Sequence, residues 1–168
     1  MHWSDNVHFC YFADHGLNEN NTFFIGFSFQ HEFCVGTSAE WRLGAGELKW
    51  LVLDTCDAVL NTDPSHIAAT WGGPMQGCHM VFGFIGENTD EWFTRDRGKD
   101  FGNEVGAGTV LAESWLNHAY SWWLGDNPIA IAAGENEADA VNRRETESIG
   151  GRDFPVLTTA FLAWKWRS

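Results

Sequence analysis

Short apolar runs separated by polar segments dominate the first half of the chain. Two of them, Val7–Ala13 and Leu48–Leu53, are continuous rather than alternating. Continuous runs of this length are typical of strands that are buried on both faces of a parallel sheet. A third run, Cys78–Ile85, has the same character and ends at Gly86. The three runs predict core strands, with Leu48–Leu53 at the centre of the sheet.

The second half predicts one long helix and two further strands. Apolar residues recur at helical spacing in Thr109–Leu124, and Gly125 follows in the position of a C-cap. Pro128–Ala133 and Val156–Arg167 are rich in apolar, β-branched or aromatic residues and predict strands. Strands separated by helices or long crossovers indicate an α/β fold. We therefore expect one domain over residues 1–168, with a mostly parallel central sheet flanked by helices.

The segments between these elements carry turn and capping signals. Loops are expected in three of them: Leu17–Asn21, Asn61–Gly77 and Glu87–Gly106. The last is long enough to form a lid. Thr22–Gln30 predicts a strand of a hairpin or of a sheet extension. Helices are expected in three segments, the first of them capped by Ser38: Ser38–Leu43, Asp57–Leu60 and, unless it is an exposed connection, Glu135–Glu147.

Reactive side chains follow two of the predicted strands. The first strand runs into Asp14-His15-Gly16, and the central strand runs into Asp54-Thr55-Cys56. In open α/β sheets, ligands bind at the carboxyl ends of the strands. If the two strands are neighbours, His15 and Cys56 meet at one edge of the sheet as a candidate base and nucleophile. A helix that begins at Asp57 would lower the pKa of the thiol.

This pattern resembles the caspase and gingipain group of cysteine peptidases. In that group one strand ends in His-Gly, and a following strand ends in an acidic or small residue, a small residue and Cys. The chain is also similar, over most of residues 3–135, to a microbial family of caspase-like character. The resemblance implies that Cys56 is the nucleophile, that His15 transfers the proton, and that the N–H groups of Gly16 and Cys56 form the oxyanion hole.

The chain departs from the caspase-like pattern at two points. Members of that group have further strands before the His-Gly strand, whereas this sequence reaches that strand at Val7. We therefore expect a caspase-like sheet that lacks its first strands or rearranges them. Asp57 follows the thiol directly, and a like charge there opposes a thiolate. Asp14 and Asp54 could support the catalytic pair, but capping of nearby backbone N–H groups is the favoured interpretation.

Charge and motifs restrict the partners. The net charge is −13, which argues against binding to nucleic acid or to anionic membranes. It suits a peptide or protein substrate with basic residues, a high-salt cytoplasm, or simple solubility. Glycine-rich stretches lack a Walker lysine or a strand-linked GxGxxG motif, so no cofactor is expected. His31 and Cys34, with His8 or His79, match no zinc spacing, so no metal is expected.

Location and assembly follow from the ends of the chain and from the cysteines. The segment Met1–Asp5 has no apolar signal-peptide core, and the four cysteines form no CxxC pair. We therefore expect a cytoplasmic protein with reduced thiols. Trp164 and Trp166, on one face of the terminal strand, could form a homodimer by strand pairing.

The sequence leaves three functions open. The first is a thiol-dependent hydrolase, most plainly a peptidase, that uses His15 and Cys56. The second is a non-catalytic domain of the same fold that binds a peptide or protein, in which Cys56 is an inert buried thiol. The third is an enzyme of natural-product metabolism with a closed, tryptophan-lined pocket.

Overall fold

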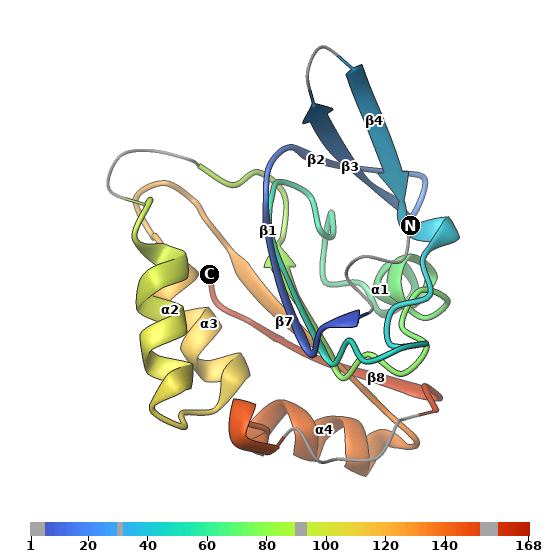
Figure 1. The fold of residues 1–168 in the computed structure, drawn as a ribbon, viewed down its shortest axis with the longest axis vertical. Helices are drawn as coiled ribbons and strands as arrows, with labels where there is room; N and C mark the ends of the chain where they lie inside the picture. Colours follow the sequence, from blue (N-terminus) through green and yellow to red (C-terminus); the bar gives the residue numbers. More distant parts are fainter. Residues whose placement is uncertain (1–5, 30–31, 90–93, 152–157) are drawn as a thin grey trace.

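The computed structural model describes residues 6–29, 32–89, 94–151 and 158–168, and these fold around a five-stranded sheet (Figure 1). Its strands, in spatial order, are β1 Phe9–Ala13, β5 Trp50–Asp54, β6 Met80–Phe84, β7 Pro128–Gly134 and β8 Phe161–Trp166. β1, β5 and β6 are parallel, whereas β7 is antiparallel to both of its neighbours. The sheet is therefore mostly parallel, as predicted, and β5 occupies an inner position.

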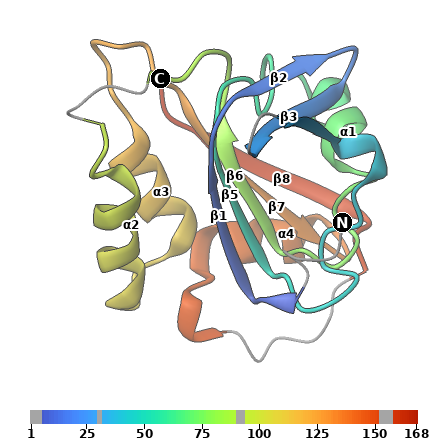
Figure 2. The same ribbon diagram turned by 45° about the horizontal axis from the view of Figure 1, so that its top comes forward.

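Helices cover both faces of this sheet (Figures 1 and 2). On one face, α2 (Arg97–Gly106) and α3 (Leu111–Ala119) build a core in which the rings of Phe101 and Trp115 meet edge to face at 5.6 Å. On the other face lies α1 (Pro64–Trp71), and α4 (Glu137–Thr146) packs against β7 and β8. Both sides of the central strands are buried, which explains their continuous apolar runs.

A second, antiparallel sheet follows β1 directly. It consists of β2 (Gly16–Glu19), β3 (Thr22–Phe29) and β4 (Glu32–Thr37). The predicted loop Leu17–Asn21 is wrong, because only Asn20 and Asn21 form the turn, with φ angles of 52° and 61°. The predicted strand Thr22–Gln30 is confirmed as β3 apart from Gln30, which lies outside the described residues.

Two segments that carry loop signals contain helices. In Asn61–Gly77, the Asp63-Pro64 pair starts α1, because the Asp63 side chain accepts a hydrogen bond from the Ser65 N–H and proline fits the first helical turn. In Glu87–Gly106, α2 buries Phe101 and Val105, which lie four residues apart on one face. The glycines and charges of this segment obscure that short apolar stripe.

Three other predicted helices and the terminal strand are present with shorter bounds than expected. The helix Ser38–Leu43 shrinks to a 3₁₀ turn at Ser38–Glu40, which Thr37 caps, while the Ser38 hydroxyl accepts from the Phe23 N–H. The long helix is confirmed as α3 but ends at Ala119, so Gly125 is no C-cap. Glu135–Glu147 forms α4. The terminal strand is present from Phe161, and its predicted start at Val156 lies outside the described residues.

Among the described residues, no helix is long and apolar enough to cross a membrane.

Candidate functional site

The ends of β1 and β5 bring the two predicted reactive residues to one edge of the sheet. Ala13 and Asp54 are register partners at the ends of these parallel strands, so His15 and Cys56 each follow two residues later. The backbone of Gly16 packs directly on this second turn, since a Cβ atom there would lie 2.5 Å from the Cys56 carbonyl oxygen. Only glycine permits this approach. The sequence therefore predicted the neighbouring strands and their common edge correctly.

His15 is exposed and is held through its backbone. Its N–H donates to Asp14 Oδ1 at 2.7 Å, and its carbonyl accepts from the Gly26 N–H at 3.1 Å. Asp14 therefore caps a neighbouring N–H, as the favoured interpretation predicts. Within the described ranges, no hydrogen bond joins the His15 imidazole to Cys56.

The pattern of hydrogen-bonded pairs between β2 and β3 determines the direction of the Gly16 N–H group. Because the Gly26 N–H bonds to the His15 carbonyl, residues 15 and 26 form a hydrogen-bonded pair of the antiparallel ladder. Gly16, which pairs with Ile25, then directs its N–H away from β3. This N–H group does not donate to β3 and can therefore donate to a bound ligand.

The Cys56 thiol is half-buried beside the loop that follows β6. It donates to the Asn88 carbonyl at 3.5 Å and accepts from the Asn88 N–H at 3.4 Å. The predicted helix at Asp57–Leu60 is wrong: Asp57 adopts a left-handed φ of 56°, and Val59 bridges to Ile85 instead. Over the ranges that the structure describes, no helix begins directly after the thiol. Burial and the nearby Glu87 carboxylate raise the pKa of Asp57.

Asp54 is fully engaged at the end of β5. Its carboxylate accepts from the Tyr11 hydroxyl at 2.6 Å, from the Arg97 guanidinium at 2.6 Å and from the Asn88 amide at 2.9 Å. Burial and the Asp54 charge together raise the pKa of Tyr11 well above its usual value, so Tyr11 acts as a neutral donor. Within the described residues these donors are all side chains, so the interpretation of Asp54 as a backbone cap is wrong. Asp54 serves instead as an anchor that orients Asn88, the residue in contact with the thiol.

Arg97 extends this network into the interior. Its guanidinium also bonds to Asp126 Oδ2 at 3.0 Å and lies 4.8 Å from the centre of the Phe84 ring. The Asp126 side chain is 1% exposed and accepts from the Thr89 N–H at 2.9 Å. Burial raises the pKa of Asp126, and Arg97 opposes that rise. The loop that borders the thiol is therefore fixed by one buried cation between two carboxylates.

Two histidines away from this edge contact glutamates. His79 contacts Glu147 at 2.7 Å near the opposite ends of the strands, and His118 contacts Glu104 at 2.6 Å. In the described part of the chain, no group of three or more His, Cys, Asp or Glu side chains could hold a metal ion, and His31 lies outside that part. All four cysteines are free thiols.

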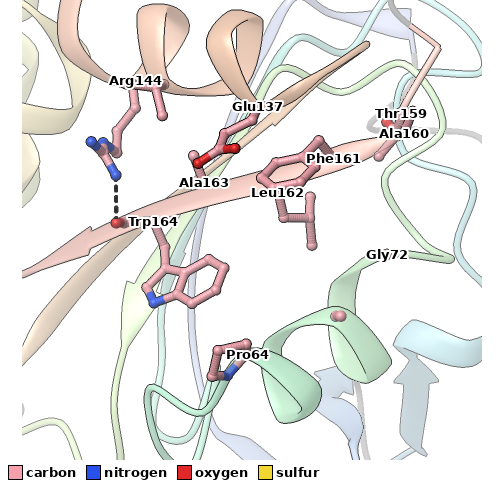
Figure 3. A pocket seen from close by; sticks show the side chains of 12 residues that line it. Pro64, Gly72, Glu137, Arg144, Thr159, Ala160, Phe161, Leu162, Ala163 and Trp164 are labelled. Atoms are coloured by element: carbon pink, nitrogen blue, oxygen red, sulfur yellow. Dashed lines mark hydrogen bonds between the residues drawn. The ribbon is translucent and has the colours of Figure 1, made fainter.

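A large cleft lies away from this edge, along the outer strand β8 (Figure 3). It has a volume of about 550 Å³ between α1 and α4, and it is lined mostly by apolar groups such as Phe161, Leu162 and Trp164. Arg144 donates to the Trp164 carbonyl at 2.7 Å and so occupies one acceptor of the open strand edge. No cysteine or histidine is among the described residues that line this cleft.

Sequence reasoning missed the residues that organise the site. Tyr11, Asn88, Arg97 and Asp126 come from four separate segments, and none belongs to a local motif. Arg97 fell within a segment that we had expected to be a surface loop. The one sequence feature that could have indicated this network is Arg97 itself, which lies close to the apolar face of the short amphipathic helix α2.

One family model matches residues 1–166, and its description is a domain of unknown function, DUF6345. The chain belongs to this family. No curated protein and no solved structure matches the chain.

Proposed function

We propose that this member of the DUF6345 family is a thiol-dependent hydrolase, most plainly a peptidase, with a caspase-like arrangement of His15 and Cys56. The supporting observation is the packing of Gly16 on the Cys56 peptide, which brings the His-Gly turn against the cysteine turn. Two turns that follow parallel neighbouring strands give a base and a nucleophile fixed by the same sheet.

In the proposed reaction, the Cys56 sulfur attacks the carbonyl carbon of a peptide bond, and the thiol proton passes to His15. The carbonyl π bond becomes an oxyanion, which the N–H groups of Gly16 and Cys56 stabilise. Collapse of this intermediate breaks the C–N bond, and the leaving amine takes the proton from His15. Water then hydrolyses the thioester and restores the thiol.

The contacts of the thiol define what must change when substrate binds. The hydrogen bond from the thiol to the Asn88 carbonyl is long, at 3.5 Å, and thiols are weak donors. Replacing this bond by one to the His15 imidazole therefore costs little free energy. The Asn88 N–H can remain on the sulfur, where it would favour the thiolate. Catalytic hydrogen bonds often tighten only when substrate is bound.

The proposal is tested by the alkylation rate of each cysteine as a function of pH, read by mass spectrometry. Cys34 is exposed and serves as the internal reference for an unactivated thiol. We expect half-buried Cys56 to react at least about tenfold faster than Cys34 at pH 7, and His15→Ala to abolish that advantage. If Cys56 reacts no faster than Cys34 in the parent protein and in His15→Ala, the hydrolase proposal is refuted.

The second candidate is a non-catalytic peptide- or protein-binding domain of the same fold. The observation that favours it is the two-sided contact between the Cys56 thiol and the Asn88 backbone, which is also what an inert structural thiol would make. A small-molecule enzyme of natural-product metabolism is the third candidate. A slow alkylation of Cys56 that does not depend on His15 would exclude the hydrolase and favour these two candidates.

The proposed setting follows from charge, free thiols and the open edge of β8. We propose a cytoplasmic location, a basic peptide or protein substrate, no nucleic-acid or membrane partner, and no cofactor or metal. A homodimer through β8 would have to displace Arg144 from the Trp164 carbonyl. Light scattering of the parent protein and of Trp166→Lys measures whether that edge pairs.

A further inference from the structure

We infer that the cleft between α2 and the turn Ser121–Asp126 binds the guanidinium group of an arginine side chain in a peptide or protein partner. The cleft has a volume of about 420 Å³. Its walls combine aromatic rings with carboxylates, including Asp96, Asp100, Trp122 and Trp123. This inference concerns binding alone and does not depend on chemistry at Cys56.

The aromatic wall is a pair of exposed indoles. Trp122 is 78% exposed and Trp123 is 68% exposed, and their rings stack with centroids 6.4 Å apart and planes 25° from parallel. Adjacent exposed tryptophans leave a large apolar surface in water, which is typical of an interaction site. Both indoles project from a turn in which Leu124 and Asp126 donate backbone hydrogen bonds to the Ser121 carbonyl.

This turn is fixed to the interior, so the backbone that carries the two indoles is held in place before a ligand arrives. Asp126, at its end, is buried and bonded to Arg97 and to the Thr89 N–H. Through Arg97 the turn is tied to Asp54 at the end of β5. A preorganised aromatic surface loses little conformational entropy on binding, which increases the affinity that its contacts can supply.

The opposing wall supplies negative charge that the fold does not use. Asp96 stands at the N-cap of α2, yet its side chain makes no capping hydrogen bond, and its 3.8 Å contact with exposed Lys99 is a weak surface pair. In the described ranges, the Asp100 carboxylate has no hydrogen bond or ion pair. The arginine that lines the cleft, Arg97, is neutralised by the carboxylates of half-buried Asp54 and buried Asp126.

An arginine fits this combination better than a lysine or a neutral ligand. A guanidinium is planar, so it can stack on an indole while its N–H groups form paired hydrogen bonds to a carboxylate. The protein already uses one such contact at the border of the cleft, where the Arg167 guanidinium carbon lies 4.4 Å from the centre of the Tyr120 ring. The net charge of −13 attracts a cationic partner from a distance.

The test is calorimetric titration of the full chain carrying Cys56→Ser, so that turnover cannot interfere. The ligands are three blocked tripeptides, Ala-X-Ala, in which X is arginine, lysine or citrulline, the neutral isostere of arginine. We expect the arginine peptide to bind about tenfold more tightly than the citrulline peptide, about threefold more tightly than the lysine peptide, and more weakly as salt rises.

Two variants and one control locate the binding. Trp122→Ala and Asp100→Asn should each weaken the arginine peptide at least about fivefold, because each removes one of the two contacts. Trp166→Ala removes another exposed indole, on β8, and should change nothing. Equal binding of citrulline, no binding of the arginine peptide at millimolar concentration, or parental affinity in either cleft variant would overturn the inference. None of these outcomes bears on the reactivity of Cys56.

Discussion

Replacement of Arg97 by methionine is expected to destabilise the protein strongly. Methionine retains much of the packing of the side chain over the Phe84 ring but removes the hydrogen bonds to Asp54, Asn88 and Asp126. It leaves the buried carboxylate of Asp126 without its counter-charge. Removing one partner of a buried ion pair costs about 3–5 kcal/mol. For a chain of this length, that loss corresponds to a decrease in Tm of about 6–20 °C.

The loss should depend on pH in a direction that the structure predicts. Burial raises the pKa of Asp126 in the folded state, so the folded protein binds this proton more tightly than the unfolded chain. Stability from such a group is present at low pH and is lost as pH rises through the folded-state pKa. Arg97 opposes the rise, so Arg97→Met should raise the pKa further. The destabilisation should therefore be larger at pH 7 than at about pH 5.

Urea unfolding followed by circular dichroism at both pH values measures these two effects. Arg95→Met is the matched control, since Arg95 is exposed two residues earlier and should cost little. Partial recovery in the double variant Arg97→Met/Asp126→Asn would identify the unpaired carboxylate as the cause. A loss below about 1 kcal/mol, or one that is the same at both pH values, would refute the assignment of Arg97 as the buried counter-charge.

Three further outcomes test other parts of the fold. Glu147→Ala should cost about 3 kcal/mol in urea unfolding, because it removes the carboxylate that accepts from the buried Trp50 indole and contacts the buried His79 imidazole at 2.7 Å; a loss no greater than that of a surface variant would contradict this. Gly83→Ala should cost about 1–3 kcal/mol, since its Cβ would lie 2.3 Å from that of Ala58, whereas Gly73→Ala meets nothing within 4 Å and should be near neutral. Hydrogen bonds from Ser65 lower the pKa of the Asp63 carboxyl, so Asp63→Ala should lower Tm at neutral pH. The difference in Tm should vanish in acid, below that lowered pKa, and a difference that is independent of pH would contradict the role of Asp63 as a cap.

The sequence determined the central strands and the location of the candidate pair. The strands β5 and β6 are buried on both faces and the edge strand β1 is half-buried, so their apolar runs are continuous and visible without knowledge of their neighbours. The parallel direction of β1 and β5 then places the residues that follow them at one edge. His15 and Cys56 were found in this way because strand ends are a local feature.

Local signals were misleading where tertiary contacts decide the structure. Leu17–Asn21 has turn chemistry, yet its first three residues belong to β2 because β3 provides their hydrogen-bonding partner. Asp57 was expected to start a helix, but the hydrogen bond from its N–H to the Gly86 carbonyl holds it in a left-handed turn. α2 was hidden by its glycines, and the sheet stabilises it by burying Phe101 and Val105.

Only the tertiary structure decided what surrounds the thiol. Asn88 reaches Cys56 because the parallel neighbours β5 and β6 end at the same edge, and Arg97 and Asp126 meet because α2 and the turn after α3 lie over that edge. These contacts span 9 to 43 residues in sequence, and no periodicity or motif encodes them. The apolar pattern of the chain fixes which strands form a core, whereas the partners of a buried charge depend on where the fold leaves a place for it.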